Sequence, residues 1–349
     1  MKHTRICATD LFCGAGGLTN GLIRSGIDVR LGVDIDEHCV YPYTANNSAR
    51  FLLRSVELVG KEEITPFLAD NCIRLLAGCA PCQTFSTYNQ KAKETDKRWW
   101  LLRHFARLVQ EMQPELVAME NVPNLLEQNV FQEFCATLTN EGYHITYSIV
   151  KCAEYGVPQD RKRLVCLASK FGAVNLLTPR EFGASPRTVR DAIESLPKLE
   201  AGAQDPEDPL HRSAALTPLN LKRIRASSPG GTWRDWPEEL MVTCHRKATG
   251  KNYSGVYGRM TWDMPSPTIT TQFYGFGNGR FGHPEQDRAL SLREGAILQT
   301  FPPEYVFFDP GKPVQRKIIG KLIGNAVPVV LGEVIGRSLI THVAQAAEQ

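Results

Sequence analysis

The first 170 residues alternate short β-rich runs with helix-like stretches, and this alternation restricts the fold more than any other feature of the sequence. Strands are predicted at residues 6–12, 29–34, 73–79, 116–120, 144–152 and 164–169, with a further candidate at 51–56. Helices are predicted between them, at residues 18–25, 37–46, 99–112 and 126–140. Such alternation favours a mostly parallel sheet with helices on both faces. We therefore predict an α/β fold.

The sequence changes character after residue 169, where prolines and glycines become frequent. Residues 200–210 carry four acidic residues and no basic one, which is typical of a solvated linker. From there to about residue 282, short strands and many turns are expected. A helical pattern returns at 318–323 and 329–347. We expect a second, irregular region that precedes a C-terminal helix.

The chain carries 40 basic and 37 acidic residues, so its formal charge is only +3. This average conceals two basic segments: residues 83–107 have six basic residues against two acidic ones, and residues 212–251 have eight against three. No apolar run approaches the roughly 20 residues of a membrane helix, and no signal-peptide core is present. We therefore expect a cytoplasmic protein, in the bacterial cytoplasm or nucleoid, with no membrane partner.

Ten cysteines are too few for a disulfide scaffold in a chain of 349 residues. Cys79 and Cys82 form a CxxC pair, but a structural zinc site would need a second such pair or a histidine pair. The sequence therefore predicts free thiols in a reducing compartment and no metal site.

A glycine-rich motif, Asp-Leu-Phe-Cys-Gly-Ala-Gly-Gly at residues 10–17, joins the first predicted strand to a helix. Glycines let backbone amides approach a ligand closely at a helix N-terminus. Asp34 ends the second strand, about 20 residues further on, where an acid can hold the ribose hydroxyls of a nucleoside. Ile35 would then lie against the adenine ring. The alternative for Asp34 is an acid that merely ends a strand in a turn.

Cys82 follows the predicted strand at 73–79, and Pro81 stiffens the turn that presents it. The carboxyl ends of strands are where open α/β sheets bind ligands. A buried structural cysteine and redox chemistry are the alternatives. Glu120 ends the next predicted strand, so it either pairs structurally or works as an acid.

A basic block, Gln-Asp-Arg-Lys-Arg at residues 159–163, precedes another apolar strand. Alternation along an extended chain sends Gln159, Arg161 and Arg163 to one side. A salt-bridge ladder on the surface is the alternative to a functional role.

Together with two later blocks, these motifs resemble the ordered motif series of DNA (cytosine-5) methyltransferases. The later blocks are Arg293-Glu294 with residues 298–302, and residues 324–328. The resemblance spans residues 6 to about 338. It implies a Rossmann-like S-adenosylmethionine-dependent methyltransferase sheet, formed by residues 1–180 and 315–349, and a smaller, irregular target-recognition domain at 181–314.

The resemblance also implies a mechanism. Cys82 would add to carbon 6 of a cytosine flipped out of the duplex, so that carbon 5 can accept a methyl group from S-adenosylmethionine. Glu120 would hydrogen-bond ring nitrogen 3 and the exocyclic amine and donate a proton. Arg163 would orient the base, and Arg161 belongs to the same implied catalytic set.

Cofactor and DNA contacts are implied in the same way. The implied cofactor site consists of Phe12, Gly14, Ala15, Gly16, Gly17, Asp34, Ile35, Val56, Pro81, Asn325, Ala326 and Val327. The implied DNA contacts are Gln83, Ser86, Gln90, Lys91, Arg246 and Arg280. The glycine-rich segment 275–282 either follows the DNA backbone or brings Arg280 to a base edge.

The sequence departs from the family pattern at a few positions. Where relatives often carry an acid that contacts adenine, this chain has Ser55-Val56. Gly295 stands in place of an alanine, and Val329 in place of a proline.

The expected partners are double-stranded DNA and a cognate restriction endonuclease that acts separately, and the chain is expected to be a monomer. RNA methylation and an inactive DNA-binding regulator on the same scaffold are the alternative functions. Gln83 and the long region 181–314 favour DNA over RNA, and Cys82, Glu120 and Arg163 favour an active enzyme.

Overall fold

The computed structural model describes residues 5–68, 71–81, 100–247 and 255–348. The chain divides into two compact units. The first comprises Met1–Tyr155, Lys162–Ser185 and Ala326–Gln349, and the second comprises Gly156–Arg161 and Pro186–Asn325.

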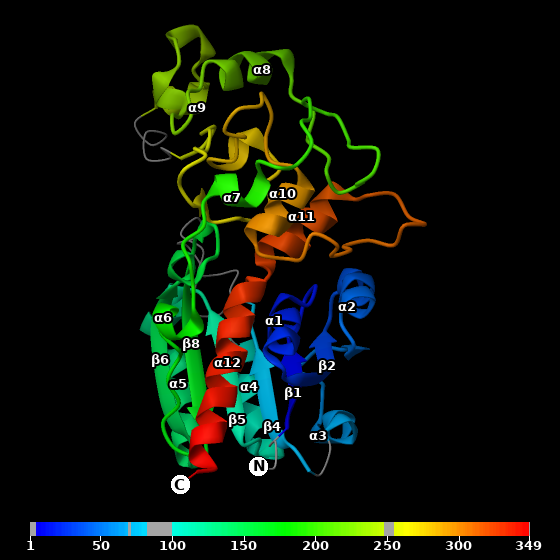
Figure 1. The fold of residues 1–349 in the computed structure, drawn as a ribbon, viewed down its shortest axis with the longest axis vertical. Coiled ribbons are helices and arrows are strands. Elements are labelled where there is room, and N and C mark those ends of the chain that lie inside the picture. Colours follow the sequence, from blue (N-terminus) through cyan, green and yellow to red (C-terminus); the bar gives the residue numbers. More distant parts are fainter. Residues whose placement is uncertain (1–4, 69–70, 82–99, 248–254, 349) are drawn as a thin grey trace. The chain divides into compact units, whose positions relative to one another are not determined.

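The first unit is built on a seven-stranded sheet with the strand order β3-β2-β1-β4-β5-β8-β6 (Figure 1). The strands are β1 (Ile6–Leu11), β2 (Asp28–Asp34), β3 (Arg50–Leu53), β4 (Ile73–Gly78), β5 (Leu116–Asn121), β6 (His144–Lys151) and β8 (Lys162–Ser169). Strands β1 to β5 pair with their neighbours in parallel, and β8 runs antiparallel to both β5 and β6. The predicted α/β fold with a mostly parallel sheet is confirmed.

Helices cover both faces of this sheet. They are α1 (Gly17–Ser25), α2 (Val40–Asn46), α3 (Lys61–Ile64), α4 (Trp100–Met112), α5 (Asn129–Asn140), α6 (Pro179–Phe182) and α12 (Val329–Ala346). The step from β1 to β2 and the step from β4 to β5 run in opposite directions across the sheet, so right-handed crossovers place α1 and α4 on opposite faces. On one face α12 packs against α1, and on the other α4 packs against α5, where Phe105 and Phe134 meet edge to face.

Glycines bring α1 and α12 into close contact. A Cβ at Gly21 would lie 2.2 Å from the carbonyl oxygen of Val329, and a Cβ at Gly332 would lie 2.9 Å from the carbonyl oxygen of Leu18. Neither position can therefore carry a side chain without moving backbone. The two helices touch along their main chains, and this contact fixes α12 to the first unit.

One helical stretch, Arg316–Ala346, is long and apolar enough to cross a membrane by length and composition. However, 72% of its apolar window is buried inside the protein. Packing in the core therefore accounts for its composition.

The expectation of free thiols is wrong at one pair of cysteines. Cys7 and Cys72 form a disulfide, with their Cα atoms 5.9 Å apart. The sheet register explains their proximity, because Ile6 on β1 pairs with Ile73 on β4, so Cys7 lies close to Cys72, the residue before β4. Seven other described cysteines keep their thiols.

The second unit has little regular structure. Its helices are α7 (Val189–Ile193), α8 (Pro218–Arg225), α9 (Thr243–Arg246), α10 (Leu292–Leu298) and α11 (Arg316–Asn325), and its short strands β7 (Gln159–Asp160) and β9 (Ser266–Pro267) pair in parallel. Short 3-10 helices occur in both units, at Glu37–Cys39, Thr65–Phe67, Pro123–Glu127, Cys152–Tyr155, Trp233–Asp235, Glu238–Leu240 and Phe276–Asn278.

The units differ from the predicted domain boundaries, 1–180 with 315–349 against 181–314, chiefly in the position of α11. This helix belongs to the second unit. It packs against α10, and its glycines lie against the chain at residues 270–274: a Cβ at Gly320 would meet the Tyr274 ring at 2.3 Å, and one at Gly324 would meet the Thr270 backbone at 2.4 Å. The first unit therefore resumes at Ala326.

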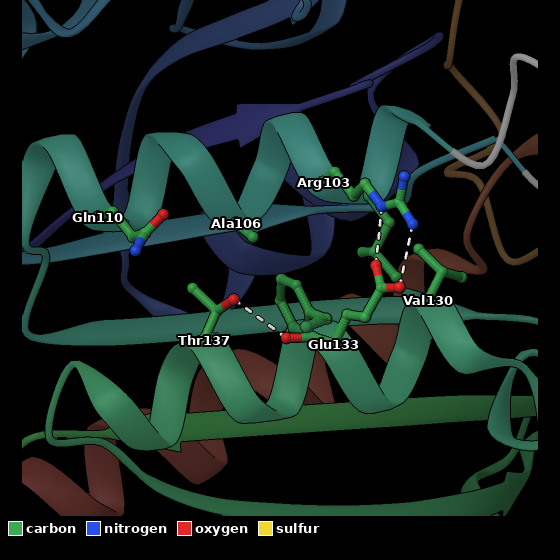
Figure 2. Close-up of a pocket in the computed structure, with 8 residues that line it drawn as sticks. Arg103, Ala106, Gln110, Val130, Glu133 and Thr137 are labelled. Carbon is green, nitrogen blue, oxygen red and sulfur yellow. Dashed lines mark hydrogen bonds and ion pairs between the residues drawn. The ribbon is translucent and has the colours of Figure 1, made fainter.

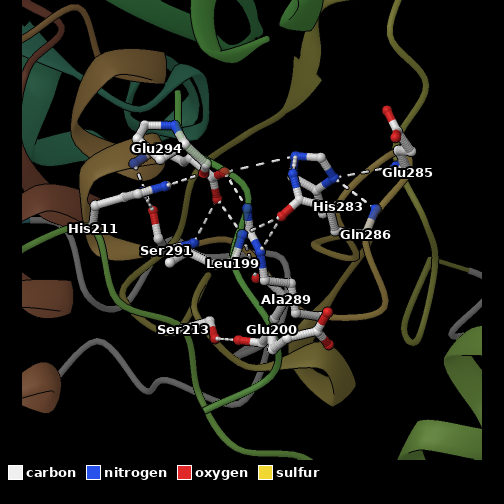
Figure 3. Close-up of polar contacts among 12 residues, drawn as sticks. Leu199, Glu200, His211, Ser213, His283, Glu285, Gln286, Ala289, Ser291 and Glu294 are labelled. Carbon is white, nitrogen blue, oxygen red and sulfur yellow. Dashed lines mark hydrogen bonds and ion pairs between the residues drawn. The ribbon is translucent and has the colours of Figure 1, made fainter. Parts of the chain in front are cut away.

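A buried ion pair stabilises the second unit. Arg288 and Glu294 are both fully buried, and the guanidinium donates to both carboxylate oxygens at 2.8 and 2.7 Å. Figure 3 shows Glu294 with its neighbours Ser291 and His283. Burial raises the pKa of Glu294, but the charge and hydrogen bonds of Arg288 outweigh this and lower it to about 2. Burial also lowers the pKa of the neighbouring His283 to about 4, so that this ring is neutral. The pair is thus ionised at neutral pH.

We predict that Arg288→Met destabilises the protein by about 3–5 kcal/mol, because it leaves the Glu294 carboxylate buried without its cation. The double variant Arg288→Met/Glu294→Gln should recover part of this loss, since no buried charge remains. Arg225→Met is the matched control: that guanidinium is 63% exposed in its pair with Asp287, so its removal should cost less than about 1 kcal/mol. Urea titrations of the four proteins measure these differences. Equal losses in the single and double variants would contradict the prediction.

Candidate active site

The glycine-rich motif after β1 forms a tight turn into α1. Gly14 and Gly16 adopt left-handed φ values of 54° and 91°, which glycine tolerates. Phe12 has a φ of 58°, which is unusual for a residue with a side chain, and such strain is found most often at functional sites. Gly16 is the N-cap residue of α1. Because glycine has no side chain, the first backbone N–H groups of the helix receive no hydrogen bond from a capping side chain.

Asp34 links this turn to the end of β2. Its Oδ2 accepts a hydrogen bond from the backbone N–H of Gly14 at 2.9 Å, and its Oδ1 accepts one from Asp36 at 2.9 Å. Burial raises the pKa of Asp34 against the effect of these hydrogen bonds. Next to it, Ile35 is 72% exposed, an uncommon position for a large apolar side chain. In contrast, Val56 is buried in the core, and its carbonyl oxygen accepts a hydrogen bond from Arg107 at 3.1 Å.

A second buried carboxyl lies beneath the turn and was not singled out in the sequence. Asp10 accepts a hydrogen bond from the Thr19 hydroxyl at 2.6 Å, and that hydroxyl lies 3.1 Å from the Tyr43 hydroxyl. The other carboxyl oxygen, Oδ1, is buried without a hydrogen-bond partner. Burial, opposed by the Thr19 hydrogen bond, raises the pKa of Asp10 to about 7.

Glu120 lies where three adjacent strands converge. It is 2% exposed, at the carboxyl end of β5. The Nε of Arg163, on β8, lies 2.9 Å from its Oε1, and the thiol of Cys79, just beyond β4, donates to its Oε2 at 2.8 Å. The structure therefore brings the predicted residues Glu120 and Arg163 together.

The chain leading to Cys82 is fixed by its neighbours. The N–H of Cys79 donates to the Leu11 carbonyl at 3.3 Å, and the amide of Asn121 donates to the Ala80 carbonyl at 3.1 Å. Pro81 is exposed. The residues that follow lie outside the described part of the chain, and these include the candidates Cys82, Gln83, Ser86, Gln90 and Lys91.

Arg161 and Arg163 separate, although they belong to one block. Burial alternates through residues 159–163 as predicted, but the extended chain is interrupted at Arg161, between β7 and β8. Arg161 belongs to the second unit, where its guanidinium donates to the Ile269 carbonyl at 3.1 Å. Gln159 lies in the same unit and donates to Gln299 at 3.0 Å.

The remaining predicted contacts are distributed over both units. Asn325 is exposed and ends α11, whereas Ala326 and Val327 are buried where the first unit resumes. Arg246, on α9, is exposed and donates to the Glu238 carbonyl at 2.8 Å. Arg280 is exposed and makes no hydrogen bond or ion pair with any other described residue.

Local partners neutralise part of the two basic segments. In the first, Arg103 pairs with Glu133 at 2.7 Å and Arg107 pairs with Glu111 at 2.8 Å. In the second, Arg225 pairs with Asp287. The net positive charge counted from the sequence therefore overstates the charge that is available to a partner.

A cavity of about 210 Å³ lies between α4 and α5, away from these residues (Figure 2). Apolar side chains of Leu102, Ala106, Val130 and Phe134 form part of its lining, and the Arg103–Glu133 ion pair spans the two helices beside it. It contains none of the candidate catalytic residues, so we do not connect it with the site at Glu120.

Cys79 and Asn121 were not assigned a role in the sequence. The signal that could have indicated them is the register of two parallel strands: Gly78 pairs with Met119, so the next residues, Cys79 and Glu120, are neighbours. This pairing is not encoded in the local sequence pattern.

Comparison with known proteins identifies the family. A family model for C-5 cytosine-specific DNA methylases matches residues 6–341. The chain belongs to this family. The Type II methylase M.HgiDII of Herpetosiphon aurantiacus is 49% identical to it over 333 residues, which cover 95% of this chain and 94% of that protein. The Type II methyltransferase M.Eco47II of Escherichia coli is 31% identical, over 95% of this chain and 78% of the relative.

The methyltransferase also shares its fold with solved structures. A DNA modification methyltransferase encoded within an E. coli prophage superposes with a TM-score of 0.74 at 22% identity, covering 97% of this chain and 99% of that one. The protein is a DNA (cytosine-5)-methyltransferase. This assignment favours DNA methylation over the RNA-methylating and inactive alternatives.

We predict that Asp10 makes the stability of the methyltransferase fall as the pH rises. Its pKa in the folded protein is about 7, above the ordinary value of 3.8, so the folded state keeps a proton that the unfolded state has lost. The stabilisation is complete below about pH 4 and is lost as the pH rises through 7. From pH 5 to pH 8, the free energy of unfolding of the wild type should fall by about 3 kcal/mol more than that of Asp10→Asn.

Urea titrations across this range test the prediction. Glu37→Gln, which removes an exposed carboxylate shortly after β2, should keep the slope of the wild type. Parallel pH profiles for the wild type and Asp10→Asn would show that Asp10 is ionised in the folded protein at these pH values.

Proposed function

We propose that this enzyme transfers the methyl group of S-adenosylmethionine to carbon 5 of a cytosine flipped out of a specific double-stranded DNA sequence, through a covalent adduct with Cys82. The observation that supports this most is the buried Glu120 carboxylate, held by Arg163 and Cys79 at the carboxyl ends of the central strands. Open α/β sheets bind their ligands at this edge.

The residues after β1 and β2 are suited to hold S-adenosylmethionine, which supplies the methyl group. The turn from Phe12 to Gly17 leads into the N-terminus of α1, an end of a helix that favours polar or anionic groups of a ligand. Asp34 uses one lone pair on each oxygen for Gly14 and Asp36, so acceptor sites remain for ribose hydroxyls. Exposed Ile35 offers an apolar surface for a base. Val56 is buried, so any contact that it makes with S-adenosylmethionine would use the edge of its side chain or its backbone.

Each proposed catalytic residue has a separate task. The Cys82 thiolate adds to carbon 6 of cytosine, which makes carbon 5 nucleophilic; once carbon 5 carries the methyl group, loss of its proton and elimination of the Cys82 thiolate restore the ring as 5-methylcytosine. Glu120 hydrogen-bonds ring nitrogen 3 and the exocyclic amine, and donates a proton as charge develops. Arg163 keeps this carboxylate oriented and contacts the base. Flipping the cytosine costs a few kcal/mol, which DNA contacts must offset.

Arg280 is the best-supported DNA contact among the described residues. It is exposed and unpaired, and its stem covers a glycine: a Cβ at Gly258 would lie 2.7 Å from Arg280 Cγ. A guanidinium held in this way can donate two parallel hydrogen bonds to a guanine edge. We therefore assign Arg280 to base recognition. Arg161 lies within the second unit, and there its proposed role is to hold the chain at Ile269.

The relatives named as Type II enzymes suggest the biological setting. We propose that the enzyme acts as a monomer in the bacterial cytoplasm and protects DNA from a separate restriction endonuclease with the same target sequence.

We predict that Cys82→Ser abolishes methyl transfer and leaves S-adenosylmethionine binding largely intact, because only the covalent step needs the thiolate. Bisulfite-type sequencing of DNA from cells that express the chain measures activity and identifies the target together. Cys244→Ser, at an exposed cysteine, is the control and should stay active. Near-normal methylation by Cys82→Ser would overturn the covalent mechanism.

We further predict that Arg280→Ala reduces discrimination at one base pair of the target by about 10-fold to 100-fold. Methylation rates on the target and on its single-base variants measure this discrimination. Arg187→Ala, another exposed arginine of the second unit, should not alter it. A uniform loss across all sequences, together with a smaller salt dependence of binding, would indicate a phosphate contact instead.

A further inference from the structure

Cys79 is placed beside Glu120 by the sheet itself. Gly78 pairs with Met119 across the parallel strands β4 and β5, so the residues that follow them are neighbours. Side chains at paired positions of adjacent strands point to the same face. The thiol therefore faces the carboxylate and donates to its Oε2 at 2.8 Å.

The backbone around Cys79 leaves the thiol little freedom. Its N–H is bound to the Leu11 carbonyl, and the following carbonyl, that of Ala80, accepts the Asn121 amide. On its other side, Gly78 has no room for a side chain, since a Cβ there would lie 2.7 Å from the Leu11 carbonyl oxygen. The main chain that carries the thiol is thus fixed relative to β1 and β5.

Two groups hold Glu120 from opposite neighbours in the sheet, Arg163 through an ion pair and Cys79 through a hydrogen bond. Arg163 on β8 contacts Oε1, and Cys79 beyond β4 contacts Oε2. Oε1 accepts no hydrogen bond from the described residues and Oε2 accepts one, from Cys79, so acceptor sites remain on both oxygens for the edge of a base. The ion pair on one side and the thiol hydrogen bond on the other favour a single orientation of the Glu120 side chain.

We propose that Cys79 is a positioning residue for the methylation reaction: its thiol holds the Glu120 carboxylate in the orientation that receives the cytosine. This inference rests on the proposed role of Glu120. The preformed orientation removes the need to order the carboxylate when the base enters, so it acts on the chemical step and leaves cofactor affinity unchanged.

The test compares Cys79→Ala, which removes the donor, with Cys79→Ser, which keeps one. A hydroxyl has a shorter bond to Cβ but still reaches hydrogen-bond distance of Oε2. Single-turnover methyl transfer to duplex DNA containing the target is measured with saturating S-adenosylmethionine. Cys79→Ala should lower the rate about 10-fold or more, and Cys79→Ser should stay within about threefold of the wild type.

Coupling to Glu120 separates positioning from a structural effect. In a Glu120→Gln background, Cys79→Ala should slow the residual reaction less than twofold, because the group it positions has gone. Cys244→Ala controls for the loss of a thiol. Equal losses in Cys79→Ser and Cys79→Ala, a full effect of Cys79→Ala in the Glu120→Gln background, or no effect in the wild type would each overturn the inference. Absence of methyl transfer by the wild type would instead refute the proposed function.

Discussion

The pairing of β5 with β4 on one side and with β8 on the other is the constraint on which the catalytic arrangement depends. Parallel pairing places the residue after β4 beside Glu120, and antiparallel pairing brings the start of β8 to the same end of β5. A shift of one residue in either pairing would turn these side chains to the opposite face. The apolar core beneath, which includes Met119 and Leu164, specifies the register, so packing and chemistry are determined by the same contacts.

Most of the first unit could be predicted from the sequence, because its strands and helices have strong local patterns. All six predicted strands are present with ends within two residues, and the candidate at 51–56 corresponds to the shorter β3. Glu120 and Arg163 could be predicted from their positions at strand ends. The Cys79 contact could not, because a register between strands about 40 residues apart is a property of the assembled sheet.

Other differences between the predictions and the structure also arise from contacts between residues that are far apart in the chain. The arginines at 161 and 163 look equivalent in an alternating block, yet the strand breaks between them and each bonds within a different unit. The charges counted along residues 83–107 are partly neutralised by Glu133, which lies on another helix. The proximity of Cys7 and Cys72, 65 residues apart, likewise follows from strand order rather than from cysteine spacing. Each depends on partners that are distant in the chain.

The close packing of α1 against α12 has a consequence for how the protein is made. The ion pair between Arg24 and Glu333 joins residues 309 positions apart, and the helix contact around Gly21 and Gly332 spans a similar separation. The turn at residues 12–17 opens directly into α1, so its final support arrives only when the ribosome has synthesised α12. Contacts of such high sequence separation slow folding. When the ribosome has synthesised every strand of the sheet, the nascent chain therefore still lacks α12, the helix that supports the turn after β1.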